Sequence, residues 1–233
     1  MCDRIRIGKQ TIEDLETLSS RLLEKLPNKD YFDDAPRLIS RTKDVNAYNN
    51  LQYKKLQSTS YLFKAIDTYC AGNEMGKNVL KKDLYNKIEK TGGILEELNL
   101  AIGARVMLRR NLDVPKGLVS GSMGTVRGFK WKLLSREQEK EGDLPEHVLI
   151  EFDDPNIASN YDDVEGACVK IKPLTVEFQG KFGKKISRLM LPLILCWAVT
   201  IHKMQGNKKL ISFCDLMIIN KERINYLTRS DIG

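Results

Sequence analysis

The sequence is poor in the residues that build metal centres and membrane spans. It has two histidines, and its five cysteines are widely spaced and form no CxxC pair, so no zinc site is expected. The odd cysteine count favours reduced thiols. The longest apolar run, Leu189 to Ile201, contains Pro192 and is too short to span a membrane. The first residues lack the apolar core of a signal peptide, which predicts an intracellular protein without a membrane partner.

A phosphate-binding loop is also missing. That loop needs the pattern GxxxxGK[ST], whose amides cradle phosphates and whose hydroxyl holds magnesium. The nearest segment, residues 72–78, is one residue short and ends in Asn78, and no apolar run ending in paired acids precedes it. Because both Walker elements are missing, we expect the chain alone to be catalytically inactive and to bind no cofactor tightly.

The composition is that of a globular protein of one or two domains. The chain has 233 residues, of which 42% are hydrophobic and 30% charged, and its formal net charge is +7. These values exclude a disordered tail and a coiled coil. The mild basic excess is compatible with a polyanionic partner.

The first hundred residues suggest an α/β sheet. Thr11 and Asp14 have the spacing of a capping box, which predicts a helix ending near Pro27. A short strand at 37–40 is followed by a polar turn and a helix that ends near Leu56, the unit of an α/β sheet. Further predicted elements are a strand at 61–66 and two helical stretches within 71–97.

The pattern changes after Leu98. Five short apolar runs alternate with turns, which predicts a small barrel of the SH3 or OB kind. These runs are 104–108, 125–129, 148–152, 168–171 and 175–178. The run 189–200 is apolar throughout and predicts a strand buried on both faces of a parallel sheet. The order of elements favours a barrel inserted into an α/β domain.

Charge is segregated along the chain. Residues 99–132 carry seven basic side chains and one acid, residues 133–165 carry eleven acids and two basic side chains, and residues 166–209 carry nine basic side chains and one acid. If both basic segments share one barrel face, they form a positive groove. The acidic segment is then expected to be a solvated outer loop.

The predicted final strand ends in a cluster of polar side chains. These are Thr200, His202, Lys203, Gln205 and Gly206. Ligands bind at the carboxyl ends of parallel strands in open α/β sheets, and hydroxyl, imidazole, cationic and amide groups can hold phosphate oxygens. A capped strand-to-helix turn would account for the same residues without a function.

Several segments in colinear order resemble the C-terminal half of a Pif1-like ATP-dependent DNA helicase, of the kind also found in Helitron transposons. The segment LPLILCWAVTIHKMQG at 191–206 is similar to the family pattern LPLxLAWAxTIHKSQG. Further matches are RIRIG at 4–8, TKDVNAYN at 42–49, FKAID at 63–67, AIGARVMLRRNLD at 101–113 and GLVSGSMGTV at 117–126.

The resemblance implies a partial RecA-like motor domain (2A) with an inserted SH3-like β-barrel (2B). Residues 1–34 would be a linker helix after a missing first motor domain, 35–98 and 189–206 the two parts of domain 2A, 99–188 the barrel, and 207–233 a divergent tail. The DNA-binding candidates are Thr42, Asn46, Arg105, Arg109, Arg110, Thr200 and His202. The residues expected to couple the nucleotide state to DNA binding are Lys203, Gln205 and Gly206.

The same resemblance implies partners and cofactors. Single-stranded DNA would be the ligand, and ATP with Mg²⁺ would drive 5′–3′ unwinding in the complete enzyme. A second chain is a candidate source of the missing motor domain. Nuclear localisation and roles in DNA repair, recombination and telomere maintenance would follow for a eukaryotic protein.

The chain departs from the family pattern in its last part. Met204 replaces the serine of the HKSQG motif, and the segment after Gly206 matches nothing expected of the family. Two further readings therefore stay open. One is a non-enzymatic module whose lysines and arginines bind phosphates and whose Phe129, Trp131 or Phe182 stacks on bases. The other is a decayed transposon-derived fragment without a stable fold.

Overall fold

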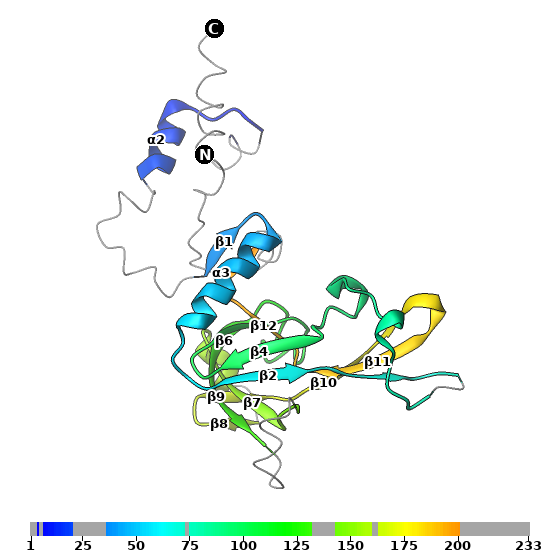
Figure 1. Cartoon of the computed structure of the whole chain (residues 1–233). Helices are drawn as coiled ribbons and strands as arrows, with labels where there is room; N and C mark the ends of the chain where they lie inside the picture. The colour runs from blue at the N-terminus through cyan, green and yellow to red at the C-terminus, as the bar shows by residue number, and fades with distance from the viewer. Residues whose placement is uncertain are drawn as a thin grey trace.

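Three units follow one another in space: a small α/β unit, a β domain and a projecting arm (Figure 1). The computed structural model describes residues 4, 7–20, 36–72, 75–131, 143–159 and 163–200. Within these residues no helix is long and apolar enough to cross a membrane. Among the described cysteines, Cys70 and Cys168 are free thiols.

The predicted capping box is present at helix α2 (Ile12–Ser20). The Thr11 amide donates to the Asp14 carboxylate at 3.0 Å, and the Asp14 amide donates to the Thr11 hydroxyl at 3.2 Å. Arg4 holds the same carboxylate with two hydrogen bonds of 2.6 and 2.8 Å. These donors, Arg4 first among them, keep the pKa of Asp14 well below its usual range. The expected helix end near Pro27 lies outside the described residues.

The α/β unit consists of two parallel strands and one helix. Strand β1 (Arg37–Ile39) pairs with β13 (Ala198–Thr200), and α3 (Thr42–Lys55) packs on them. Ile39, Val45 and Ala198 form the small core between helix and strands. The predicted strand and helix of this region are confirmed.

Eight strands and one short helix form the β domain. Six of the strands make one sheet in the order β12-β5-β6-β7-β9-β8, and β2 and β4 make an antiparallel pair. Their bounds are β2 (Ser60–Lys64), β4 (Glu97–Ala101), β5 (Arg105–Leu108), β6 (Met123–Lys130), β7 (His147–Phe152), β8 (Val164–Glu165), β9 (Cys168–Ile171) and β12 (Leu193–Leu195). Helix α4 (Pro155–Ser159) contacts β7 and β9.

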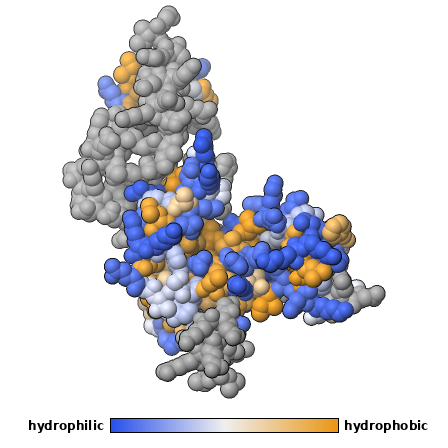
Figure 2. Space-filling model, viewed as in Figure 1, coloured by the Kyte–Doolittle hydropathy of each residue, from blue (hydrophilic) through white to orange (hydrophobic). Residues whose placement is uncertain are grey.

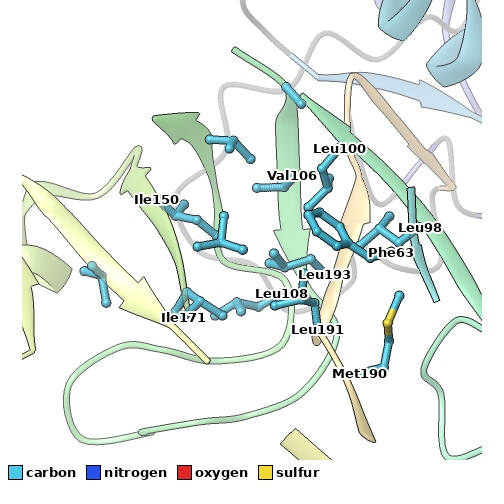
Figure 3. Packing of buried hydrophobic residues seen from close by; sticks show 14 of the residues in the cluster. Phe63, Leu98, Leu100, Val106, Leu108, Ile150, Ile171, Met190, Leu191 and Leu193 are labelled. Carbon is cyan, nitrogen blue, oxygen red and sulfur yellow. The ribbon is translucent and has the colours of Figure 1, made fainter. Parts of the chain in front are cut away.

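One apolar core joins the β2–β4 pair to the six-stranded sheet. Phe63 from β2, Leu100 from β4, Leu108 from β5 and Ile150 from β7 are all nearly inaccessible and belong to one cluster (Figure 3). The alternation of buried and exposed residues along β4 places one face on this core.

The arm is a three-stranded antiparallel sheet with single helical turns at its far end. Its strands are β3 (Ile66–Tyr69), β10 (Leu174–Gln179) and β11 (Lys185–Met190), in the order β10-β11-β3. The turns are η3 (Lys81–Asp83), η4 (Ile88–Lys90) and η6 (Lys181–Gly183). The prediction of two helical stretches within 71–97 is therefore wrong, since the described residues there form only single 3₁₀ turns.

The apolar run 189–200 is not one strand of a parallel sheet. Its residues are divided among β11 in the arm, β12 in the six-stranded sheet and β13 in the α/β unit. Hydrophobicity predicted burial on both faces, which holds for most of these residues, but it carries no information about the bends between them. Strand β10 also differs from expectation, because it pairs with β11 in the arm and is absent from the six-stranded sheet.

The structure bears on the expected division of the chain. The boundary between residues 98 and 99 falls inside β4, and the boundary between 188 and 189 falls inside β11. Strand β2, assigned to the first part of domain 2A, packs in the core of the β domain. The domain division itself stays a prediction.

Candidate nucleic-acid interface

The parallel pairing of β1 and β13 brings two predicted site residues to one edge. Thr200 lies opposite Ile39 in the register, and α3 begins three residues after Ile39, at Thr42. The carboxyl ends of both strands and the amino end of the helix therefore meet at the same edge. Thr200 is buried there, with 7% of its surface exposed.

The exposed face of helix α3 carries two of the candidates. Thr42 and Asn46 are exposed and are one helical turn apart, whereas Val45 faces the core. The helix has fourteen residues and no side-chain cap at Arg41, so its amino end presents backbone amides beside Thr42. Such an end favours anionic groups.

Asn49 fixes this helix to the strands, and sequence reasoning did not single it out. Its amide nitrogen donates to the carbonyls of Leu195 at 3.2 Å and Ala198 at 3.0 Å. Its amide oxygen accepts from the Ala198 backbone at 2.7 Å. Only 5% of Asn49 is exposed, which is unusual for an asparagine on a helix, but the sequence does not indicate its distant partners.

The three candidate arginines do not share one surface. Arg105 and Arg109 lie at opposite ends of β5, and Arg105 forms a bidentate pair with Asp153 at 2.6 Å for both contacts. Arg109 donates to the Gly93 carbonyl at 3.2 Å, and its partial burial lowers the pKa of its guanidinium. Arg110 is exposed.

The described part of the acidic segment, residues 143–159 and 163–165, is not a solvated outer loop. It contributes β7, which lies inside the six-stranded sheet, and four of its acids pair with basic side chains of the β domain. The pairs are Arg105 with Asp153, Arg127 with Glu151, Lys130 with Glu165, and both Lys170 and Lys172 with Asp163. The charge blocks seen along the sequence therefore neutralise one another across this sheet.

The aromatic candidates fall into two groups. Phe129 and Trp131 pack against Tyr61 and Phe63, with ring centroids 4.9 to 6.1 Å apart, and thus contribute to the core. Phe182 is the opposite case, since 82% of it is exposed at the end of the arm.

The remaining candidates lie beyond the described residues. They are His202, Lys203, Gln205 and Gly206. Among the residues that the structure does describe, no three His, Cys, Asp or Glu side chains are grouped so as to hold a metal ion.

A family model and curated relatives match this chain. The model "DNA helicase Pif1, 2B domain" matches residues 83–129, which include β4, β5 and most of β6. The Xenopus laevis "ATP-dependent DNA helicase PIF1" is 30% identical over 204 residues. That alignment covers 87% of this chain but only 26% of the relative, so the chain spans about a quarter of the length of this relative.

Solved structures support the same fold. The Candida albicans Pif1 helicase matches with a TM-score of 0.64 and 21% identity, over 97% of this chain and 48% of that chain. The Bacteroides Pif1 helicase "in complex with ADP-AlF3 and ssDNA" matches with a TM-score of 0.53 and 18% identity, over 91% of this chain and 42% of that chain. The predicted fold class, part of a RecA-like motor with a 2B domain, is confirmed by these neighbours. The chain is therefore a Pif1-like helicase segment.

Proposed function

We propose that this chain is the part of a Pif1-like 5′–3′ DNA helicase that binds single-stranded DNA, and that the complete protein couples ATP hydrolysis to unwinding. The observation that carries the proposal is the edge where β1, β13 and the start of α3 meet. The phosphates of a DNA strand would lie across the amino end of α3, next to Thr42 and Asn46.

The relatives support the ligand and the energy source. The Xenopus protein is named an ATP-dependent DNA helicase, and the Bacteroides structure holds ADP-AlF3 and single-stranded DNA. In the complete protein ATP with Mg²⁺ would be the cofactor, and a further segment or partner chain would supply the phosphate loop that this sequence lacks. Lys203, Gln205 and Gly206 would then respond to the bound nucleotide.

Hydrogen bonds fix helix α3 to the strands, so that its exposed side chains are in a defined position for contact with DNA. Asn49 anchors it to Leu195 and Ala198, so Thr42 and Asn46 keep a fixed position relative to Thr200. Thr200 would act through its backbone and the segment that follows, because its side chain is nearly covered. Of the three candidate arginines, Arg110 is the exposed one and would be the most accessible to a phosphate.

Fluorescence anisotropy of a labelled single-stranded oligonucleotide with the full chain tests the proposal. We expect salt-sensitive binding that is tighter than binding to a blunt duplex. Thr42→Ala and Asn46→Ala should each weaken it about two- to tenfold, the effect of one lost hydrogen bond. Asn50→Ala, an exposed asparagine on the same helix, is the matched control.

Two outcomes would contradict the proposal. One is no binding of single strands by the wild-type chain at low salt. The other is equal weakening by all three substitutions, which would indicate a general loss of helix stability. A separate measurement of ATP turnover distinguishes a helicase segment from a non-enzymatic binding module, since only the former should restore turnover when the missing motor segment is supplied.

Localisation to the nucleus is a further proposal that rests on the family resemblance alone. Fluorescence microscopy of the tagged chain in a eukaryotic cell tests it, and exclusion from the nucleus would contradict it.

A further inference from the structure

The far end of the arm is a compact structure built from two distant segments. We call residues 81–90 and 180–185 the arm tip. Gly180 packs so closely on the Asp83 carbonyl that a Cβ atom at this position would lie 2.8 Å from that oxygen. Lys184 donates to the Asp83 carboxylate at 2.9 Å, which joins the two segments again. In Figure 1 the yellow hairpin turn and one of the teal turns lie side by side at this end of the arm.

The arm tip is strongly basic. It carries seven lysines and two acids, Asp83 and Glu89. Asp83 is buried and is bound by Tyr69 and Lys184, so it contributes little negative charge to the surface. The exposed lysines are Lys81, Lys82, Lys87, Lys90 and Lys185. Figure 2 shows hydrophilic residues over much of the arm. In the described part of the β domain, by contrast, most basic side chains pair with acids.

Phe182 stands out at the turn between β10 and β11. Its side chain is 82% exposed, and its backbone has a φ of 58°, a left-handed conformation in which bulky residues are rare. The following residue, Gly183, has a φ of 71°. Glycine or asparagine would fit position 182 with less strain, and the phenyl ring gains little burial in return. Folding alone therefore gives no reason for phenylalanine at this position.

A second aromatic ring of the arm tip, that of Tyr85, lies against two lysines, one of which precedes Phe182 in the chain. The Lys90 ammonium lies 4.5 Å from the centre of the Tyr85 ring, and the Lys181 ammonium lies 5.9 Å from it. Flexible lysines beside an exposed aromatic ring are the combination that binds single-stranded nucleic acids, because the lysines contact phosphates and the ring stacks on a base.

We propose that the arm tip is a second binding site for the same single strand, at which an unpaired base stacks on Phe182 and lysines such as Lys82 and Lys185 contact the adjacent phosphates. The inference rests on the proposed function, because it assigns to that strand a contact outside the edge formed by β1, β13 and α3. The proposed ligand is an unpaired base, because both faces of a base inside a duplex are stacked on its neighbours and cannot stack on Phe182.

The experiment uses the full chain and anisotropy with a single-stranded oligonucleotide and a blunt duplex. Phe182→Asn keeps a residue that tolerates the left-handed backbone and removes the ring. We expect it to weaken single-strand binding about fivefold and to leave duplex binding unchanged. Phe182→Trp should bind single strands at least as tightly as the wild type. Val114→Ala, which truncates an exposed apolar side chain of the β domain, is the control.

The lysines are tested through the salt dependence of binding. Lys185→Gln should lower the slope of log K against log salt by about 0.7 for a single strand, because one fewer counterion is released. It should weaken binding to single strands and to duplexes alike. An unchanged slope would remove the phosphate contact from the proposal.

The outcomes separate this inference from the proposed function. Weakening by Thr42→Ala and Asn46→Ala but not by Phe182→Asn would overturn the arm-tip site alone. Weakening by Phe182→Asn without an effect of the helix substitutions would support the arm tip and overturn the other site. If Phe182→Asn abolishes a concentration-dependent self-association seen by size-exclusion chromatography and leaves DNA binding intact, Phe182 is a protein contact and the inference is wrong.

Discussion

The β domain and the arm bury their residues in different ways. Most of a cluster of nineteen buried apolar residues lies in the β domain, and it reaches the arm only at its base, through residues such as Val176 and Met190. The arm places an arginine–aspartate pair at its base, where Arg188 is 2% exposed, and a tyrosine–aspartate–lysine group near its tip. Apolar burial depends on area and shape, whereas buried ionic groups must meet specific partners. Substitutions that remove side-chain volume should therefore destabilise the β domain most. Substitutions that remove one member of an ion pair should destabilise the arm most.

The largest effect is expected in the core of the β domain. Phe63 is 1% exposed and packs against Phe129 with ring centroids 5.5 Å apart. Phe63→Ala should lower the free energy of unfolding by about 3–5 kcal/mol, because it removes the transfer energy of the ring and leaves a cavity. Urea unfolding followed by circular dichroism measures the change.

The neighbouring residue on β2 is the matched control. Leu62 is more than a third exposed and points away from the core. Leu62→Ala should change the free energy of unfolding by no more than about 0.5 kcal/mol. Equal losses for the two substitutions would mean that β2 does not pack on the six-stranded sheet as described.

The next effect concerns the base of the arm. Arg188 donates to Asp67 at 2.7 and 2.8 Å and to the Ile94 carbonyl at 3.0 Å. Arg188→Met should cost about 3 kcal/mol, because it leaves the Asp67 carboxylate without its partner in a largely covered site. Adding Asp67→Leu should recover most of this loss, since the double variant has no unpaired charge.

A double-mutant cycle on unfolding free energies checks this second prediction. Additive losses in the double variant would contradict it, and would show that Arg188 acts through its volume, as Phe63 does. The cycle therefore decides whether the base of the arm is stabilised by an ion pair or, like the β domain, by apolar burial.

The sequence predicted elements where neighbours in the chain are neighbours in the fold. The capping box of α2, the strand and helix at 37–56, and the strands that became β5, β6, β7 and β9 all follow from local patterns. The edge that carries Thr42 and Thr200 was predicted only in part. The family resemblance assigned both residues to DNA binding, but the sequence does not show the pairing of β1 with β13 that brings them together.

The arm could not be predicted in this way. Its base pairs Asp67 with Arg188, which are 121 positions apart, and no local periodicity reports such a partner. Asn49 is a similar case, since its hydrogen bonds reach Ala198, 149 positions away. The apolar run 189–200 was misassigned because hydrophobicity predicts burial but not the sheet in which a residue is buried.

The smallest effect is a pH dependence confined to the arm. Hydrogen bonds from Tyr69 and then from Lys184 hold the pKa of Asp83 below its usual range. A lowered pKa in the folded state stabilises the arm above the usual aspartate pKa of about 4, and this stabilisation is lost as the pH falls through the folded value. The melting temperature of the wild type should therefore fall more steeply than that of Asp83→Asn as the pH drops below about 5, because the variant has no carboxylate to protonate at this position. Glu177→Gln removes an exposed carboxylate of β10 and should follow the wild-type curve. Parallel curves for the wild type and Asp83→Asn would show that this carboxylate contributes nothing to the arm, and that the contrast with the β domain rests on the Arg188–Asp67 pair alone.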